Sequence, residues 1–113
     1  MKKYKVFYSN ESLEDLKAIY NYIALVQLEP ENAKILVSSI RDRISSLDEF
    51  PLRNPGVQWQ HSIVNNLRFV VVKKHIVFYF VNEEKSVVNI VRIFSSKRDI
   101  SAIKKWFSEK KEK

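Results

Sequence analysis

The sequence predicts a single α+β domain over residues 1–113: an N-terminal strand, an αα-hairpin, a three-stranded antiparallel meander and a short C-terminal helix. The meander is predicted by three runs of β-branched and aromatic residues within 67–99, separated by polar breaks at 73–74 and 82–86. Such runs are typical of consecutive antiparallel strands. The hairpin is predicted by apolar residues that recur at three- and four-residue steps within 13–47. A chain of 113 residues is long enough to bury one hydrophobic core.

The first strand is expected over Tyr4–Tyr8, either at the sheet edge or paired with the last strand. Ser9 or Ser12 then caps the first helix, and Asp15 follows Ser12 by three residues, as in a capping box. The apolar face of this helix is formed by Leu13, Leu16, Ile19, Tyr20, Ile23 and Val26.

A second helix is expected to begin at Pro30, because a first-turn proline lacks only an N–H that has no partner inside the helix. Its apolar stripe is Ala33, Leu36, Val37, Ile40, Ile44 and Leu47. Pro51 ends the helix, and the short link at 27–29 makes the pair an αα-hairpin. The two stripes are expected to cover one face of the sheet.

Residues 51–65 hold two of the three prolines and the only glycine, so they are predicted to form a loop of the kind that carries binding residues. After the meander, Ile100, Ile103, Trp106 and Phe107 indicate a short helix that docks on the sheet or on a neighbour. No internal repeat and no low-complexity segment is present.

Composition limits the function classes. The absence of cysteine excludes disulfides and thiolate metal sites. The basic N-terminus lacks the apolar segment of a signal peptide, and no apolar run approaches the roughly 18 residues of a membrane span. We therefore expect a soluble, cytoplasmic protein that does not bind membranes.

The charge is unevenly distributed along the chain, whose formal net charge is +7. Residues 10–50 hold four Lys and Arg against eight Asp and Glu, whereas residues 51–113 hold thirteen against five. The helical part is therefore acidic and the strand part basic. This asymmetry indicates a polyanionic or acidic partner on the strand side, or else a surface that charge keeps solvated.

Arg68 and Arg92 are the first candidate site residues. An arginine inside a strand of Val and Ile must point to solvent or serve a ligand, and we expect both to project from a concave, basic sheet face that the helices leave open. The alternative is that each pairs with a carboxylate such as Asp99 or Glu83 and has a structural role.

Other basic residues form a second group. Lys73, Lys74, Lys97 and Arg98 lie at strand ends, where a basic rim would hold phosphate or an acidic partner segment. A lysine taken alone is more often plain surface. Arg98 is alternatively one half of a structural pair with Asp99, which we interpret as the N-cap of the last helix.

His61 and His75 are the only imidazoles and hence the only side chains whose unperturbed pKa suits proton transfer near neutral pH. His61 lies in the loop, near Arg53 and Trp59, within reach of the basic face. His75 begins a strand and is expected to pack or to face solvent. Their spacing predicts no metal site, and no cofactor is expected.

An ordered set of short motifs runs through nearly the whole chain. The set comprises the strand Tyr4–Ser9, Asp15-Leu16, Tyr22-Ile23, Leu47–Pro51 followed by Arg53 and Pro55, Val77–Tyr79, Glu83-Glu84, Val91–Ile93 and Arg98-Asp99. This set resembles the RelE/ParE superfamily of toxins from bacterial type II toxin–antitoxin modules. The resemblance implies a growth-inhibiting toxin with the corresponding fold, held silent by an acidic, partly disordered antitoxin.

The resemblance leaves two mechanisms open. The slightly favoured one is metal-free, ribosome-dependent mRNA cleavage, in which Arg68, Arg92 and Arg98 stabilise charge on the scissile phosphate and His61 or a lysine transfers protons. Nucleic-acid contacts in this mechanism fall to Arg53, Lys73, Lys74 and Lys97.

The other mechanism is poisoning of DNA gyrase, as in the ParE branch, which needs no proton-transfer residue in the sheet. The sequence departs from the RNA-cleaving members because no tyrosine follows Tyr79. A further alternative is a basic interaction domain that keeps the fold without toxicity.

Overall fold

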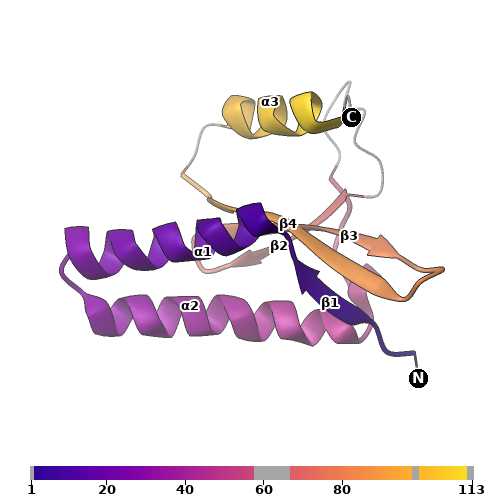
Figure 1. The fold of residues 1–113 in the computed structure, drawn as a ribbon, viewed down its shortest axis with the longest axis horizontal. Coiled ribbons are helices and arrows are strands. Elements are labelled where there is room, and N and C mark those ends of the chain that lie inside the picture. Colours follow the sequence, from indigo (N-terminus) through magenta and orange to yellow (C-terminus); the bar gives the residue numbers. More distant parts are fainter. Residues whose placement is uncertain (1, 58–66, 98–99, 112–113) are drawn as a thin grey trace.

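The computed structural model describes residues 2–57, 67–97 and 100–111, and Figure 1 shows their arrangement. The helices and strands are β1 (Lys5–Tyr8), α1 (Asn10–Asn21), α2 (Pro30–Ser45), β2 (Leu67–Val72), β3 (His75–Asn82), β4 (Val87–Ser95) and α3 (Ile100–Lys111). A π-helical turn, Tyr22–Val26, extends α1, and short 3₁₀ turns follow α2 at Ser46–Asp48 and Pro51–Arg53. The predicted α+β fold is confirmed. Within the described ranges, no helix is both long and apolar enough to cross a bilayer.

The four strands form one sheet in the order β1-β4-β3-β2. The last three strands are the predicted antiparallel meander, and β1 lies at the edge beside β4 and parallel to it. A register irregularity between Phe78 and Tyr79 interrupts the β3–β4 pairing just where Arg92 lies opposite Phe78. The first strand therefore lies both at an edge and next to the last strand.

The helical hairpin covers one face of the sheet (Figure 1). Ser9 is the N-cap of α1, since its side chain accepts a hydrogen bond from the Ser12 N–H at 3.0 Å. Asp15 therefore belongs to no capping box, and its carboxylate is used elsewhere. Pro30 opens α2 as predicted.

The main core lies between hairpin and sheet. Its buried members are Leu16, Ile40, Ile44, Leu47, Val70, Val72, Val77, Tyr79, Val88, Ile90 and Ile93. The predicted stripe of α2 is confirmed, but two residues of the α1 stripe are exposed, Leu13 and Val26. Leu13 lies about 100° around the helix from the buried Ser12. Val26 ends the π-helical turn, whose wider spiral breaks the 3.6-residue period of the stripe.

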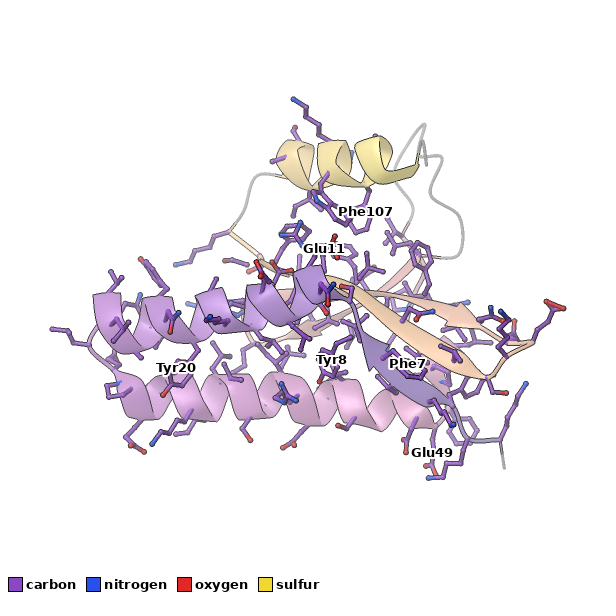
Figure 2. The ribbon with its side chains drawn as sticks, in the orientation of Figure 1. Phe7, Tyr8, Glu11, Tyr20, Glu49 and Phe107 are labelled. Atoms are coloured by element: carbon purple, nitrogen blue, oxygen red, sulfur yellow. The ribbon has the colours of Figure 1, made fainter. Side chains whose placement is uncertain are left out.

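The opposite face of the sheet is not the open basic surface that the sequence led us to expect. Helix α3 covers it with a second apolar cluster, comprising Leu67, Phe78, Phe94, Ile103 and Phe107. Figure 2 shows Phe107 directed from α3 toward the sheet. Arg68 does not project there either. Side chains alternate between the two faces along β2, so Arg68 lies on the hairpin side, together with Val70 and Val72.

Candidate functional site

Arg92 lies in an ion pair with Asp15 of α1. The Arg92 Nε donates to Asp15 Oδ2 at 2.7 Å, and its Nη2 donates to Oδ1 at 2.9 Å. The backbone N–H of Ile93 donates to the same Oδ2 at 2.8 Å. Both charged side chains are only 14% exposed. The structural role weighed for Arg92 is therefore present, with Asp15 as the partner in place of Asp99 or Glu83.

Two aromatic rings complete the surroundings of the Arg92 guanidinium. Its carbon lies 4.4 Å from the centre of the Phe94 ring and 4.7 Å from that of Trp106. These distances fit cation–π contacts. Arg92 thus joins α1, β4 and α3, and its role in holding phosphate stays a prediction that requires it to leave these contacts.

Arg68 is engaged with the loop that follows α2. Its Nη1 donates to the carbonyl of Asn54 at 2.6 Å and to that of Leu52 at 3.2 Å. The buried Tyr79 supports the same loop, since its hydroxyl donates to the carbonyl of Pro51 at 2.7 Å and accepts from Asn54 Nδ2 at 3.1 Å. Burial raises the pKa of the Tyr79 hydroxyl, which keeps it protonated as a donor.

Arg53 donates to carbonyls of the 3₁₀ turn that follows α2. Its Nη1 donates to the carbonyls of Glu49 at 2.6 Å and Ser46 at 3.3 Å, and its Nη2 donates to Ser46 Oγ at 2.8 Å. A cation is favourable there because the last carbonyls of a helix lack partners and carry partial negative charge. The contact of Arg53 with nucleic acid stays a prediction.

A groove of about 830 Å³ lies between the hairpin and the β2–β3 turn. Its apolar wall includes Ile19, Ile23, Leu36, Ile93 and Phe94. Lys73, Lys74, Lys97 and His75 lie on its polar side. The structure thus brings together three of the four second-group cations, and it adds a histidine that the sequence indicated only as a packed or solvent-facing residue.

The lysines give the groove a positive rim. Within the described part of the chain, none of Lys73, Lys74 and Lys97 forms an ion pair with a carboxylate. Of the carboxylates that line the groove, Asp15 is held by Arg92 and Glu29 accepts a hydrogen bond from Asn32. An apolar wall beside uncompensated cations suits a ligand that is both apolar and acidic.

His75 is half-buried at the groove, and its Nδ1 is buried without a hydrogen-bond partner among the described residues. Burial lowers the pKa of its imidazole, because the charged form loses hydration. The imidazole is therefore neutral at pH 7. Its position directly after Lys73 and Lys74 in the sequence is the signal that could have placed it beside the lysines.

Several candidates lie outside the described residues. His61 and Arg98 are among them, together with Trp59 and Asp99. Their predicted roles stay predictions. Among the residues that the structure does describe, no group of three or more His, Cys, Asp or Glu side chains is placed to hold a metal ion.

A comparison with protein-family models matches residues 6–100 to the family described as ParE toxin of type II toxin–antitoxin system, parDE. No curated protein matches the chain.

Solved structures share the fold. A chain of the chromosomal ParDE toxin–antitoxin system from P. aeruginosa has a TM-score of 0.65 and 22% identity, covering 82% of this chain and 96% of that one. A chain of the RelBE2 toxin–antitoxin complex from Mycobacterium tuberculosis has a TM-score of 0.61 and 15% identity, covering 82% and 98%. A mutant of the E. coli toxin RelE in the free state has a TM-score of 0.60 and 10% identity, covering 90% and 93%.

Proposed function

Because this chain belongs to the family of ParE toxins of type II toxin–antitoxin systems, we propose that it blocks bacterial growth by poisoning DNA gyrase. The family membership carries the general function, that of a toxin. The choice of gyrase as target is supported by the state of the two strand arginines.

Both arginines have internal partners. Arg92 directs two nitrogens at Asp15, and Arg68 donates to two loop carbonyls. RNA cleavage through Arg68 and Arg92 needs their guanidinium groups to be available to a phosphate as charge builds on its oxygens. Poisoning of a protein target needs a binding surface and no such group. Because Arg68 and Arg92 already have internal partners, their contacts favour gyrase poisoning over RNA cleavage.

The test uses purified toxin and purified bacterial gyrase. We expect inhibition of DNA supercoiling and accumulation of cleaved DNA that stays bound to the enzyme, and we expect the antitoxin to abolish both. In cells, pulse-labelling after induction should show DNA synthesis falling before protein synthesis, with filamentation. A toxin that stops growth while gyrase remains fully active, in vitro and in cells, would remove this proposal.

Ribosome-dependent mRNA cleavage is the second candidate, and the groove is the observation that favours it. Lys73, Lys74 and Lys97 are placed together there without carboxylate partners, and the neutral imidazole of His75 lies beside them. Cations and a neutral imidazole are what a phosphate-cleaving site requires. If this mechanism operates, the toxin cuts mRNA on programmed ribosomes, and message that stays intact there excludes it.

We also propose that the groove receives the antitoxin. An acidic, partly disordered segment would lay apolar side chains on the wall and carboxylates against the lysine rim as it folds on binding. The triple variant Lys73→Gln/Lys74→Gln/Lys97→Gln should weaken binding and flatten its salt dependence. A control with the same charge change on exposed lysines elsewhere is Lys5→Gln/Lys17→Gln/Lys85→Gln. Equal weakening by both variants would mean that net charge, and not the groove, attracts the antitoxin.

A further inference from the structure

The far end of the helical hairpin carries a patch of exposed apolar side chains. We call Leu25, Val26 and Leu28 the hairpin tip; they are 69%, 66% and 78% exposed. None of the three lines the groove, although Tyr22 and Ile35, which are also exposed, lie along its wall. Figure 1 shows the turn of the hairpin extending beyond the sheet, away from α3 and from both termini. The tip is therefore a second apolar surface, which adjoins the groove at Gln27 and Glu29 but does not line it.

The backbone at the tip is unfavourable for the residues that occupy it. Leu28 has a φ of 59°, in the left-handed region, where a side chain with a Cβ is strained and glycine is not. Leu25 and Val26 end the π-helical turn, an irregularity that often marks functional sites. A strained leucine with most of its surface in water stabilises neither the turn nor the core. The side chain is better explained by a contact outside the molecule.

Charge restricts what that contact is. No lysine or arginine occurs between Lys17 and Lys34, although the chain has 20 such residues. Two carboxylates follow the tip instead, Glu29 and Glu31. Glu31 also lies 3.7 Å from Lys34 in an exposed ion pair, which water screens, and Glu29 also lines the groove. A nucleic acid or an anionic membrane would be repelled, because both are bound through cations. A protein cleft that is apolar at its centre and basic at its rim is complementary to the tip.

We propose that the toxin binds its protein target through the hairpin tip. Leu25, Val26 and Leu28 would insert into an apolar cleft of the target that is rimmed by basic groups. This inference rests on the proposed function, in which the target is gyrase. It assigns the two apolar surfaces to two partners, with the acidic antitoxin in the lysine-rimmed groove and the target at the tip.

The chain offers a matched pair of variants for the test. Leu28→Gly removes a tip side chain whose backbone has a strained, left-handed φ. Phe50→Gly does the same between the two 3₁₀ turns that follow α2, where Phe50 has a φ of 51° and is 62% exposed. Each change deletes an exposed apolar group and relieves left-handed strain, so neither is expected to unfold the protein. Leu25→Ser/Leu28→Gly enlarges the loss at the tip.

Each purified variant is titrated into gyrase supercoiling assays and, separately, into antitoxin by calorimetry. We expect the tip double variant to need at least about tenfold more protein for half-inhibition, as for loss of an interface hot spot. The Phe50→Gly variant should stay within about twofold of the unchanged toxin, and all variants should bind antitoxin equally. Full inhibition by the tip double variant overturns the inference.

The unsubstituted toxin shows whether gyrase is the target at all. If that toxin leaves gyrase active, the proposed function is wrong, and growth arrest in cells decides the inference about the tip. Loss of arrest in the tip variants, with antitoxin binding intact and arrest retained by Phe50→Gly, supports the tip as the target surface. Arrest by all variants overturns it. So does a self-associated toxin that tip substitutions dissociate, or vesicle binding that they abolish, because the occupant is then a second copy or a lipid surface.

Discussion

Asp15 and Arg92 join the first helix to the last strand through two hydrogen bonds of 2.7 and 2.9 Å, and the Ile93 N–H donates a third to the same carboxylate. Two segments of the sequence motif set, Asp15-Leu16 and Val91–Ile93, are thus in direct contact although 77 positions separate the paired residues. Ser9 acts close by, donating to the Val91 carbonyl at 2.8 Å. The side chains of Ser9 and Asp15 therefore attach α1 to β4.

Asp15→Asn should destabilise the protein strongly. The substitution leaves the Arg92 charge in a largely buried position without its counterion, and we expect the free energy of unfolding to fall by about 2–4 kcal/mol. Urea denaturation followed by circular dichroism measures the loss. Glu14→Gln, one residue earlier and exposed, is the control and should change stability by less than about 0.5 kcal/mol. If the two variants were equally stable, the ion pair would contribute nothing to the fold.

This anchoring also determines how toxicity data on Arg92 are to be interpreted. Arg92→Ala breaks the pair with Asp15 and the contacts with Phe94 and Trp106, so we expect a loss of at least about 2 kcal/mol of stability. A loss of toxicity then follows from a smaller folded fraction as readily as from a lost phosphate contact. Purified, folded Arg92→Ala protein separates the two, because normal target inhibition per folded molecule would show that Arg92 acts through the fold.

Tyr79→Phe tests the anchoring of the loop after α2. The variant keeps the buried ring but leaves the Pro51 carbonyl without its 2.7 Å donor, which should lower the free energy of unfolding by about 1–2 kcal/mol. Tyr4→Phe is a control, since Tyr4 is only partly buried. Limited proteolysis should also cut the Tyr79→Phe variant faster after residue 53, as the loop loses one of its attachments. An unchanged rate would show that the remaining attachments hold it, namely Arg68 and the backbone hydrogen bonds of Pro55 and Val57 to β2.

The imidazole of His75 should make stability depend on pH. Its pKa in the folded protein lies below the ordinary value of 6.5 because of burial, so the unfolded chain takes up a proton that the folded protein does not. Stability is therefore fully present above pH 6.5 and falls as the pH drops below it. His75→Phe should flatten the decrease in urea midpoint between pH 7 and 5, and a slope equal to that of the unsubstituted protein would contradict this.

Most of the fold could be predicted from the sequence, because the spacing of apolar residues and the β-branched composition of the strands indicate it. The α2 stripe from Ala33 to Leu47 and the three apolar runs of the meander follow directly from side-chain spacing. The α1 stripe was wrong at Val26, where the chain makes a π-helical turn that leaves no mark in the apolar pattern. Docking of α3 on the sheet was one of the two outcomes expected for it, and it is confirmed. The expectation of an open second face was wrong, because nothing in the spacing of Ile103 and Phe107 states which face of the sheet α3 meets.

The candidate site was predictable in its residue types and less so in its contacts. The clustering of Lys73, Lys74 and Lys97 follows from their places at the ends of adjacent strands, and the groove brings them together. The partner of Arg92 could not be found by sequence proximity, because only the packing of α1 against β4 brings Asp15 within reach. The strained backbone of Leu28 was equally hidden, since a left-handed residue is expected to be glycine or asparagine.

Leu28→Gly and Phe50→Gly should each stabilise the protein. Both residues hold a positive φ with their side chains largely in water, so removing the Cβ relieves strain at the cost of a more flexible unfolded chain. Because the left-handed penalty of about 1–2 kcal/mol exceeds that cost, we expect gains of about 0.5–1 kcal/mol in the free energy of unfolding. Urea denaturation measures them, with Leu13→Gly, inside α1, as the opposite control that should lose about 1 kcal/mol. A gain in stability at Leu28 together with a loss of toxicity would show that this leucine is kept for binding, whereas a loss of stability would mean that it supports the turn.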